Sequence, residues 1–322
     1  MPLDRYMSLC LGHPQFGYYM TRDPFGALGD FTTSPEISQV FGEMIGVWCM
    51  NAWMNLGSPS PFALVELGPG RGTLMADLLR AAKASPEFLL AVGVHLVEMS
   101  PALRTLQREK LDAHVTWHAS IDTLPNMPSL FVANEFFDAL PVKQFEIRDG
   151  KCFERYVGFS DGKLKMGLVP AKPRQGDEGV YEVSLVSQAI AAEIKDRIEA
   201  CGGAALVFDY GYVQTSEGDT LQAMKDHQYC DIFAAPGETD ITAHVDFSSL
   251  SPSPVLSQSK FLKAMGIEIR TEKLAVKLLG EARENFNLAT RRLIDPAQMG
   301  ELFKVMCVVQ KGAPQIYPFE AK

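Results

Sequence analysis

The stretch that decides the fold is Val65-Glu66-Leu67-Gly68-Pro69-Gly70-Arg71-Gly72-Thr73. An apolar, strand-like run ends in three alternating glycines, and a helical pattern starts immediately after them. Glycines let the backbone turn tightly and let a ligand lie against the main chain at the start of a helix. Two classes of ligand use such a loop, namely dinucleotides and S-adenosylmethionine (SAM).

The spacing and the charge of this loop favour SAM. Dinucleotide sites follow G-x-G-x-x-G, with the pyrophosphate at the helix N-terminus. This loop instead reads G-x-G-x-G and has Thr73 where that pattern wants Gly or Ala. Glu66 is unfavourable beside a pyrophosphate but suits SAM, which carries an ammonium and a sulfonium and no phosphate. The residues predicted to bind the methionine end of SAM are Glu66, Gly68, Gly70 and Gly72.

The ends of the next two predicted strands extend this cofactor site. Glu98 follows the apolar run 89–97, where a carboxylate can accept hydrogen bonds from both ribose hydroxyls. A solvated charge at a strand end is the alternative, but the distance from the glycine loop favours the ribose. The third strand, 115–118, is followed by Ser120 and Ile121 at the topological position of the adenine.

Strand-like and helix-like segments alternate over 62–133, which predicts an α/β fold with a doubly wound, mostly parallel sheet. We expect an N-terminal helical extension or lid over 1–60 and the sheet domain over 61–322. Within that domain, two Asp-Gly hairpin signals predict an antiparallel β insert at about 142–182. A long excursion at about 211–250 is expected to cap the substrate, because long excursions on such a sheet are usually functional.

The fourth predicted strand runs into Asn134-Glu135-Phe136-Phe137-Asp138. Enzymes that methylate amino groups carry [DNS]-P-P-[YFW] at this position. Asn134 and Phe137 match its ends, whereas Glu135 and Phe136 replace the prolines. A carboxylate pairs bidentately with a guanidinium, and aromatic rings can stack on its plane. We therefore predict that Asn134 lines the methyl-transfer site and that Glu135 and Asp138 hold an arginine. A capped loop with inward-packed aromatics is the simpler alternative, and at least one phenylalanine is expected to do only that.

The composition limits the classes of protein that this chain can belong to. It has 322 residues, 47% hydrophobic residues and a formal net charge of −9, values typical of a globular protein. The acidic balance argues against nucleic acid as a partner and is compatible with a cationic substrate. The six cysteines have no metal-ligand spacing, so no metal site is predicted. No apolar run is long enough for membrane insertion.

The first residues, Met1-Pro2-Leu3-Asp4, do not have the features of a signal peptide. They also lack the arginine- and serine-rich composition of a mitochondrial leader. The expected location is therefore a bacterial cytoplasm, with the mitochondrial matrix as the alternative.

Several longer segments carry a resemblance to a known family. They are Gly12-His13-Pro14, Gly17-Tyr18-Tyr19, residues 29–39, 66–73, 98–101, 134–141, 202–206, 209–211 and 240–247. Through them the chain resembles the MidA family of class I SAM-dependent methyltransferases, over most of its length. The resemblance implies a Rossmann-like methyltransferase domain, SAM as methyl donor and ω-N-methylation of protein arginine. In the characterised case the substrate is the 49-kDa-type core subunit of respiratory complex I, which is symmetrically dimethylated during assembly.

The resemblance also changes the interpretation of residues 29–39 and of one junction. It implies a lid or a ligand-side segment whose contacts are Asp30, Thr32, Thr33, Ser34 and Glu36. Family members have a further stretch between the counterparts of Leu250 and Pro254, where this chain has only Ser251-Pro252-Ser253. That stretch is expected to contain part of a helix and an edge strand, so we expect its loss to affect the completeness of the sheet.

Two other functions compete with protein-arginine methylation. The first is a non-catalytic chaperone of complex I assembly, which the shortened junction favours. The second is a SAM-dependent methyltransferase that acts on a small molecule. Binding of SAM distinguishes the chaperone from both enzymes.

Overall fold

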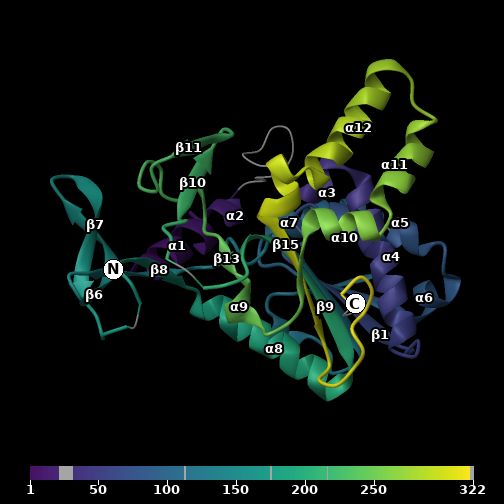
Figure 1. Cartoon of the computed structure of the whole chain (residues 1–322), viewed down its shortest axis with the longest axis horizontal. Helices are drawn as coiled ribbons and strands as arrows, with labels where there is room; N and C mark the ends of the chain where they lie inside the picture. Colours follow the sequence, from purple (N-terminus) through teal and green to yellow (C-terminus); the bar gives the residue numbers. More distant parts are fainter. Residues whose placement is uncertain (22–31, 112–113, 175, 216, 320–322) are drawn as a thin grey trace.

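A computed structural model describes residues 1–21, 32–111, 114–174, 176–215 and 217–319. Its centre is a sheet in the order β14-β15-β9-β4-β1-β2-β3, with β13 added beside β9 (Figure 1). In that order the strands are β14 (Val255–Ser257), β15 (Phe303–Val309), β9 (Gly203–Tyr212), β4 (Ser129–Asn134), β1 (Phe62–Leu67), β2 (Val92–Val97) and β3 (Val115–His118), and β13 is Val245–Asp246. The two pairings of β15, with β14 and with β9, are antiparallel, and the other pairings of this sheet are parallel. The predicted doubly wound, mostly parallel sheet is thus confirmed.

Two apolar layers cover this sheet because successive residues of a strand point to opposite faces. In β1, Phe62 and Leu64 pack into one core, whereas Ala63 and Val65 pack into the other. The first core includes side chains of α4 (Gln39–Asn55), α5 (Thr73–Ala82), α6 (Pro86–Ala91), α10 (Gln258–Ala264), α11 (Ile267–Ala275) and α12 (Gly280–Ile294). The second includes α8 (Leu185–Cys201) and α9 (Phe247–Leu250).

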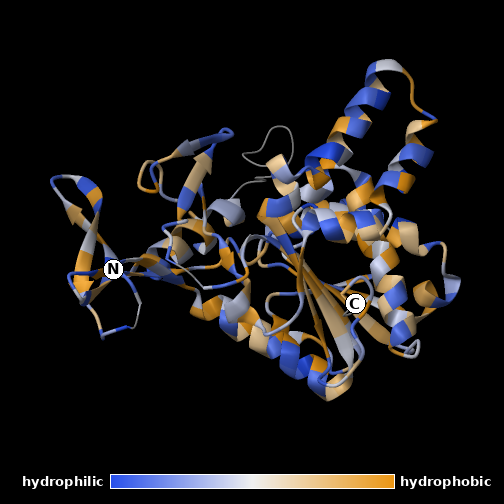
Figure 2. Cartoon of the chain, in the orientation of Figure 1, coloured by the Kyte–Doolittle hydropathy of each residue, from blue (hydrophilic) through white to orange (hydrophobic). Residues whose placement is uncertain are grey.

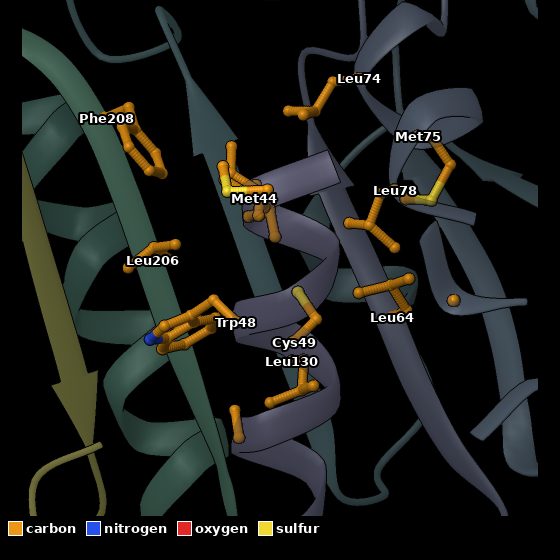
Figure 3. Close-up of a cluster of buried hydrophobic side chains, with 14 of the residues drawn as sticks. Met44, Trp48, Cys49, Leu64, Leu74, Met75, Leu78, Leu130, Leu206 and Phe208 are labelled. Carbon is orange, nitrogen blue, oxygen red and sulfur yellow. The ribbon is translucent and has the colours of Figure 1, made fainter. Parts of the chain in front are cut away.

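The first core is the more densely aromatic of the two. Figure 3 shows Met44 and Trp48 of α4 between strand β9, which carries Leu206 and Phe208, and helix α5, which carries Leu78. Figure 2 shows the same division as a hydrophobic central sheet inside helices of alternating hydropathy. Burial on both faces explains why these strands are continuous apolar runs in the sequence.

The antiparallel insert is also present, as a four-stranded sheet in the order β7-β6-β5-β8. Its strands are β5 (Lys143–Arg148), β6 (Lys151–Ser160), β7 (Lys163–Pro170) and β8 (Gly179–Val183). The excursion after β9 forms a second small sheet of β10 (Gln222–Lys225), β11 (Gln228–Cys230) and β12 (Asp240–Thr242). Helix α1 (Leu3–Gly12) packs into a third apolar cluster with residues of the insert and the excursion.

The remaining short elements connect these parts. They are α2 (Tyr18–Thr21), α3 (Ser34–Ile37), α7 (Pro101–Lys110) and the single turns η1 (Ile121–Thr123) and η2 (Pro296–Gly300). No helix in the described ranges is long and apolar enough to cross a membrane.

At the shortened junction the sheet ends in a short edge strand, β14, so an edge strand is present there despite the missing stretch. Three residues of β14 pair with β15, from Val255 opposite Met306 to Ser257 opposite Lys304. The carbonyl of Pro254 accepts a further hydrogen bond from the backbone N–H of Cys307, at 3.2 Å. The preceding helix α9 has only four residues. On its other side β15 forms seven residue pairs with β9. The expectation that the missing stretch affects the completeness of the sheet stays a prediction.

Candidate cofactor and substrate site

The glycine loop brings the backbone of β1 close to the loop that follows β4. Gly68 has φ +60°, and a Cβ there would lie 2.8 Å from a ring carbon of Phe136. Gly72, with φ +77°, is the residue before α5, and its N–H donates to the carbonyl of Pro69 at 2.7 Å. A side chain at position 68 would clash with the ring of Phe136, so this position requires glycine. Position 72 favours glycine because the turn into α5 needs a positive φ.

A pocket lies against this loop and unites segments far apart in the sequence. It is lined by Thr33, Pro35, Glu36, Glu66, Gly68, Pro69, Gly70, Arg71, Thr73, Leu74, Asn134 and Glu135. Three predicted cofactor residues, Glu66, Gly68 and Gly70, thus lie in one cavity with the predicted methyl-transfer residue Asn134. Gly72 does not line this cavity, and it contributes by forming the turn that leads into α5.

Glu66 is the most unusual residue of the pocket. Its side chain is 3% exposed, and its Oε2 atom is buried with no hydrogen-bond partner in the described part of the chain. Burial, followed by repulsion from Glu98, raises the pKa of Glu66 to about 8. The Oδ1 atom of Asn134 is likewise buried without a partner among the described residues. Because unpaired buried acceptors are costly, these two atoms suit a ligand that brings several donors, such as an ammonium group.

Glu98 lies at the end of β2, beside the glycine loop. Its Oε1 accepts from the backbone N–H of Ser100 at 2.8 Å, and its Oε2 accepts from Nε2 of Gln107 at 3.4 Å. The same Gln107 nitrogen donates to the carbonyl of Gly70 at 2.7 Å. Burial raises the pKa of Glu98. Gln107, which sequence reasoning missed, therefore joins the predicted ribose carboxylate to the glycine loop.

The two residues predicted at the adenine are not brought into this pocket. Ser120 is half-buried, and its hydroxyl donates to Oδ2 of Asp122 at 3.1 Å. Ile121 is buried in the second core. The adenine assignment of Ser120 and Ile121 therefore stays a prediction from topology.

Glu135 lies directly after β4, with an unusual backbone φ of +49°. Its Oε1 accepts from the backbone N–H of Ser34 at 2.9 Å and from Nδ2 of Asn134 at 3.0 Å. The N–H of Glu135 donates to the carbonyl of Phe208 at 2.9 Å, which anchors this conformation on β9. Burial is the main cause that raises the pKa of Glu135 to about 7.

Asp138 is the second carboxyl group of this loop. Its Oδ2 accepts from the hydroxyl of Tyr210 at 2.6 Å, whereas its Oδ1 is buried and has no partner in the described ranges. Burial raises the pKa of Asp138 to about 6. The ring of Tyr210 makes edge-to-face contacts with His244 and Phe303 at centroid distances of 5.3 and 5.4 Å. One oxygen of Asp138 is thus held by the protein, and the other is left for a donor.

Asp209 holds the backbone of this loop through hydrogen bonds and was not predicted as a site residue. It is fully buried within β9, and its Oδ2 accepts from the N–H groups of Phe137 and Asp138 at 3.0 and 3.2 Å. Its Oδ1 accepts from the N–H of Tyr210 at 3.0 Å. Burial and the nearby carboxylates raise the pKa of Asp209 well above its usual range. An acid directly after the apolar run 204–208 was the available signal.

The two phenylalanines of the loop pack differently. Phe137 is 3% exposed and belongs to the second core, whereas the ring of Phe136 packs against Gly68. Their rings meet edge to face at 5.3 Å. Phe137 thus anchors the loop in the core, while Phe136 packs against the glycine loop.

The predicted lid residues are divided between the pocket and its surroundings. Thr33 and Glu36 line the pocket, and Glu36 accepts a short hydrogen bond from the hydroxyl of Thr73. Ser34 contacts Glu135 through its backbone as described above, and Thr32 lies outside the pocket, facing α12. Asp30 lies outside the described residues.

Known proteins share sequence with this chain over most of its length. The model of a family described as S-adenosyl-L-methionine-dependent methyltransferases matches residues 44–257. The human mitochondrial protein arginine methyltransferase NDUFAF7 is 36% identical over 369 residues, which cover 98% of this chain and 83% of the relative. The Drosophila melanogaster homologue is 38% identical over 360 residues, covering 96% of this chain and 81% of the relative. Both aligned lengths exceed 322 residues, so these relatives contain residues without a counterpart here.

A solved structure resembles the whole chain. It is a crystal structure of a Burkholderia thailandensis protein bound to S-adenosyl-homocysteine, with a TM-score of 0.84 and 28% sequence identity. The match covers 100% of this chain and 92% of that protein. The arrangement of strands and helices described above is therefore shared with a protein that holds the demethylated form of SAM.

Proposed function

We propose, from the premise that this chain belongs to the family of S-adenosyl-L-methionine-dependent methyltransferases, that it methylates an arginine side chain of a protein. The observation that carries the proposal is the pair of carboxyl groups of Glu135 and Asp138 after β4. Burial raises the pKa of both, and a guanidinium would relieve that cost by pairing with them. The names of the curated relatives support the same substrate class.

The residues of the pocket fit SAM as methyl donor. The unpartnered oxygens of Glu66 and Asn134 would accept from its ammonium group, and Glu98 would accept from the ribose hydroxyls. Bound SAM supplies an electrophilic methyl group. The glycine loop contributes a bare backbone, so the cofactor can lie close to the ends of β1 and β4.

The two carboxyl groups then have distinct tasks in positioning and proton transfer. Glu135 and Asp138 hold the guanidinium in one plane, which directs one of its nitrogens toward the methyl donor. That nitrogen gains the methyl group and loses one proton. Glu135, with a pKa of about 7, is suited to accept this proton and pass it to water. Held on Ser34 and Asn134, it needs little reorganisation during the reaction.

The partner is a protein substrate, and the resemblance to the MidA family points to a complex I core subunit of the 49-kDa type. Symmetric dimethylation of one of its arginines would support assembly of the complex. The alternatives predict other outcomes. An assembly chaperone would bind the subunit without methylating it, and a small-molecule enzyme would leave its mass unchanged.

The test is the substitution Glu135→Gln, which keeps the size of the side chain and removes its charge. We expect it to abolish methylation of the core subunit, measured by mass spectrometry, while SAM affinity from calorimetry stays within about twofold. Glu87→Gln, an exposed residue of α6, is the matched control and should retain full activity. Loss of SAM binding in Glu135→Gln would contradict the role given to this residue. A wild-type protein that does not bind SAM would favour the chaperone.

For the compartment, the mitochondrial names of the curated relatives support a mitochondrial location over a bacterial cytoplasm, and the matrix is the mitochondrial compartment that we propose. Fractionation of cells from the source organism tests this. The protein is expected with matrix markers, and its presence only in a bacterial cytosol would overturn the assignment.

A further inference from the structure

Ser34, the first residue of α3, carries a buried hydroxyl without a partner. The residue is fully buried, and no described residue forms a hydrogen bond with its Oγ atom. Such a group is costly in a folded protein, because it has lost its bonds to water and has gained none in exchange. A ligand that supplies the missing bond would remove this cost.

Buried atoms of this kind are concentrated at the site. Seven buried side-chain atoms have no hydrogen-bond partner within the described ranges, and four of them belong to Ser34, Glu66, Asn134 and Asp138. The oxygens of Glu66 and Asn134 suit the ammonium group of SAM, and that of Asp138 suits a guanidinium. Because Ser34 contacts the loop that carries Asn134 and Asp138, its Oγ belongs to the same group of atoms. It is the one member of the four that has no ligand assigned to it.

The surroundings of Ser34 connect its hydroxyl with the substrate rather than with the cofactor. Its backbone N–H donates to Oε1 of Glu135 at 2.9 Å. Burial raises the pKa of Glu135, whereas the backbone N–H and the hydroxyl of Ser34 both lower it, so the hydroxyl lies near that carboxyl group. It does so without reaching the geometry of a hydrogen bond. The neighbours Thr33 and Pro35 line the cofactor pocket, and Ser34 does not.

A guanidinium also has more donors than the two carboxyl groups have places left. It carries five N–H donors in one plane. Oε1 of Glu135 already accepts from Ser34 and Asn134. Oδ2 of Asp138 already accepts from Tyr210. One oxygen of each carboxyl group is left for the substrate, and two oxygens have about four lone pairs. At least one buried donor therefore needs a further acceptor.

We infer that Oγ of Ser34 is a third acceptor for the substrate guanidinium, and that α3 thereby takes part in binding the arginine. The inference rests on the proposed function and adds a substrate-binding residue to it. A hydroxyl fits this position because it rotates, so it can accept from the substrate and still donate to Glu135. The bound arginine then joins α3 to the loop after β4, beside the cofactor pocket.

The test is Ser34→Ala, which removes the hydroxyl and keeps the backbone N–H that donates to Glu135. At pH 8.5 we expect the KM for the 49-kDa-type core subunit to rise about tenfold, the loss typical of a hydrogen bond to a charged group. Both kcat and SAM affinity should stay within about twofold. The melting temperature should not fall, because the variant no longer buries an unpaired hydroxyl. A lower melting temperature with an unchanged KM would indicate a structural role and overturn the inference.

Ser38→Ala is the matched control. Ser38 is buried in the same segment, but its hydroxyl accepts from the backbone N–H of Val40 at the start of α4. Loss of this cap should lower the melting temperature by about 2 °C and leave the KM unchanged. A KM that rises equally in both variants would overturn the inference. So would a loss of activity in Ser34→Ala that is present at pH 6.5 and absent at pH 8.5, because the hydroxyl would then act only on the pKa of Glu135.

Binding without turnover separates this inference from the proposed function. If the wild type methylates no arginine, the proposed function fails. Calorimetric titration with Nα-acetyl-L-arginine amide still tests Ser34, in protein loaded with S-adenosyl-homocysteine. Weaker binding of this probe by Ser34→Ala than by Ser38→Ala upholds the inference. Equal binding by the two variants, or no binding by the wild type, refutes it.

Discussion

The two halves of the site are built in different ways. At the ends of β1 and β2, Glu66 keeps a buried oxygen without a partner in the described chain, and the glycine loop presents bare backbone. At the ends of β4 and β9, the protein supplies its own donors. Tyr210 holds one oxygen of Asp138, and the backbone of Ser34 holds Glu135. The first half is prepared for donors that a ligand brings, whereas the second is held in shape before any ligand arrives.

The first half should therefore determine mainly the affinity for the ligand, whereas the second half should also determine how the backbone of the site is held. Changes in the first half should alter ligand binding and leave folding intact or improved. Changes in the second half should alter folding or turnover, because its carboxyl groups hold the backbone as well as the substrate. Four predictions test this separation, in order of decreasing effect.

The largest effect is expected for Asp209→Ala. The change leaves three buried backbone N–H groups without their acceptor, those of Phe137, Asp138 and Tyr210. Each unpaired group costs about 1–3 kcal/mol, so the sum approaches the whole stability of a domain. Thermal unfolding should show a loss of more than about 10 °C or no folded protein. Asp209→Asn keeps one acceptor oxygen and should be intermediate, and a wild-type melting temperature in the alanine variant would contradict the role.

A large effect on affinity, but not on folding, is expected for Glu66→Gln. It removes the charge that would pair with the ammonium of SAM, and a charge-assisted hydrogen bond of about 1.5–3 kcal/mol corresponds to roughly 10- to 100-fold in Kd. Calorimetry measures this loss. At pH 8.5 the ligand-free variant should be at least as stable as the wild type, since no buried charge has to form. Unchanged affinity for SAM would place the ammonium elsewhere.

The pH dependence of stability should have an unusual sign in the ligand-free protein. The pKa values of Glu66, Glu135 and Asp138 are raised to about 8, 7 and 6. The folded state therefore binds these protons more tightly than the unfolded state. Their contribution is complete below about pH 4 and is lost progressively as the pH rises from there through the folded-state pKa values. Denaturant titrations should show a fall of about 6 kcal/mol between pH 5.5 and 8.5, because each group loses about 1.4 kcal/mol per pH unit until its folded-state pKa is reached. Glu66→Gln should reduce the fall in stability in the upper part of this pH range. A stability that stays constant with pH would refute the raised pKa values.

The smallest effect is expected for Tyr210→Phe, which keeps the aromatic contacts and removes one hydroxyl. The hydrogen bond from Tyr210 lowers the pKa of Asp138, so its loss should raise that pKa. The acid limb of the kcat/KM profile should move up by about one pH unit, which costs several-fold in activity at pH 6.5 and little at pH 8.5. Equal losses at both values would indicate a purely structural role.

Short segments of the sequence were enough to predict the family and the cofactor. The glycine loop with Glu66 predicted SAM, and the resemblance predicted the methyltransferase family, and the comparisons confirm both. The antiparallel insert was likewise predicted from two Asp-Gly turns and is confirmed as a four-stranded sheet. These signals are local, because a strand, a tight turn and the helix after it lie within about a dozen residues. Such patterns are dictated by backbone sterics and hydrophobic periodicity.

The amino-acid sequence by itself determined the α/β alternation, the glycine loop and the acids after the fourth strand. Only the tertiary structure decided how those acids are held. Asp209 contacts a loop 71 and 72 residues earlier in the chain, and Ser34 reaches Glu135 across 101 residues. The physical reason is that a parallel sheet brings the carboxyl ends of distant strands to one edge. There, hydrogen bonds depend on distances in space that no spacing along the chain encodes.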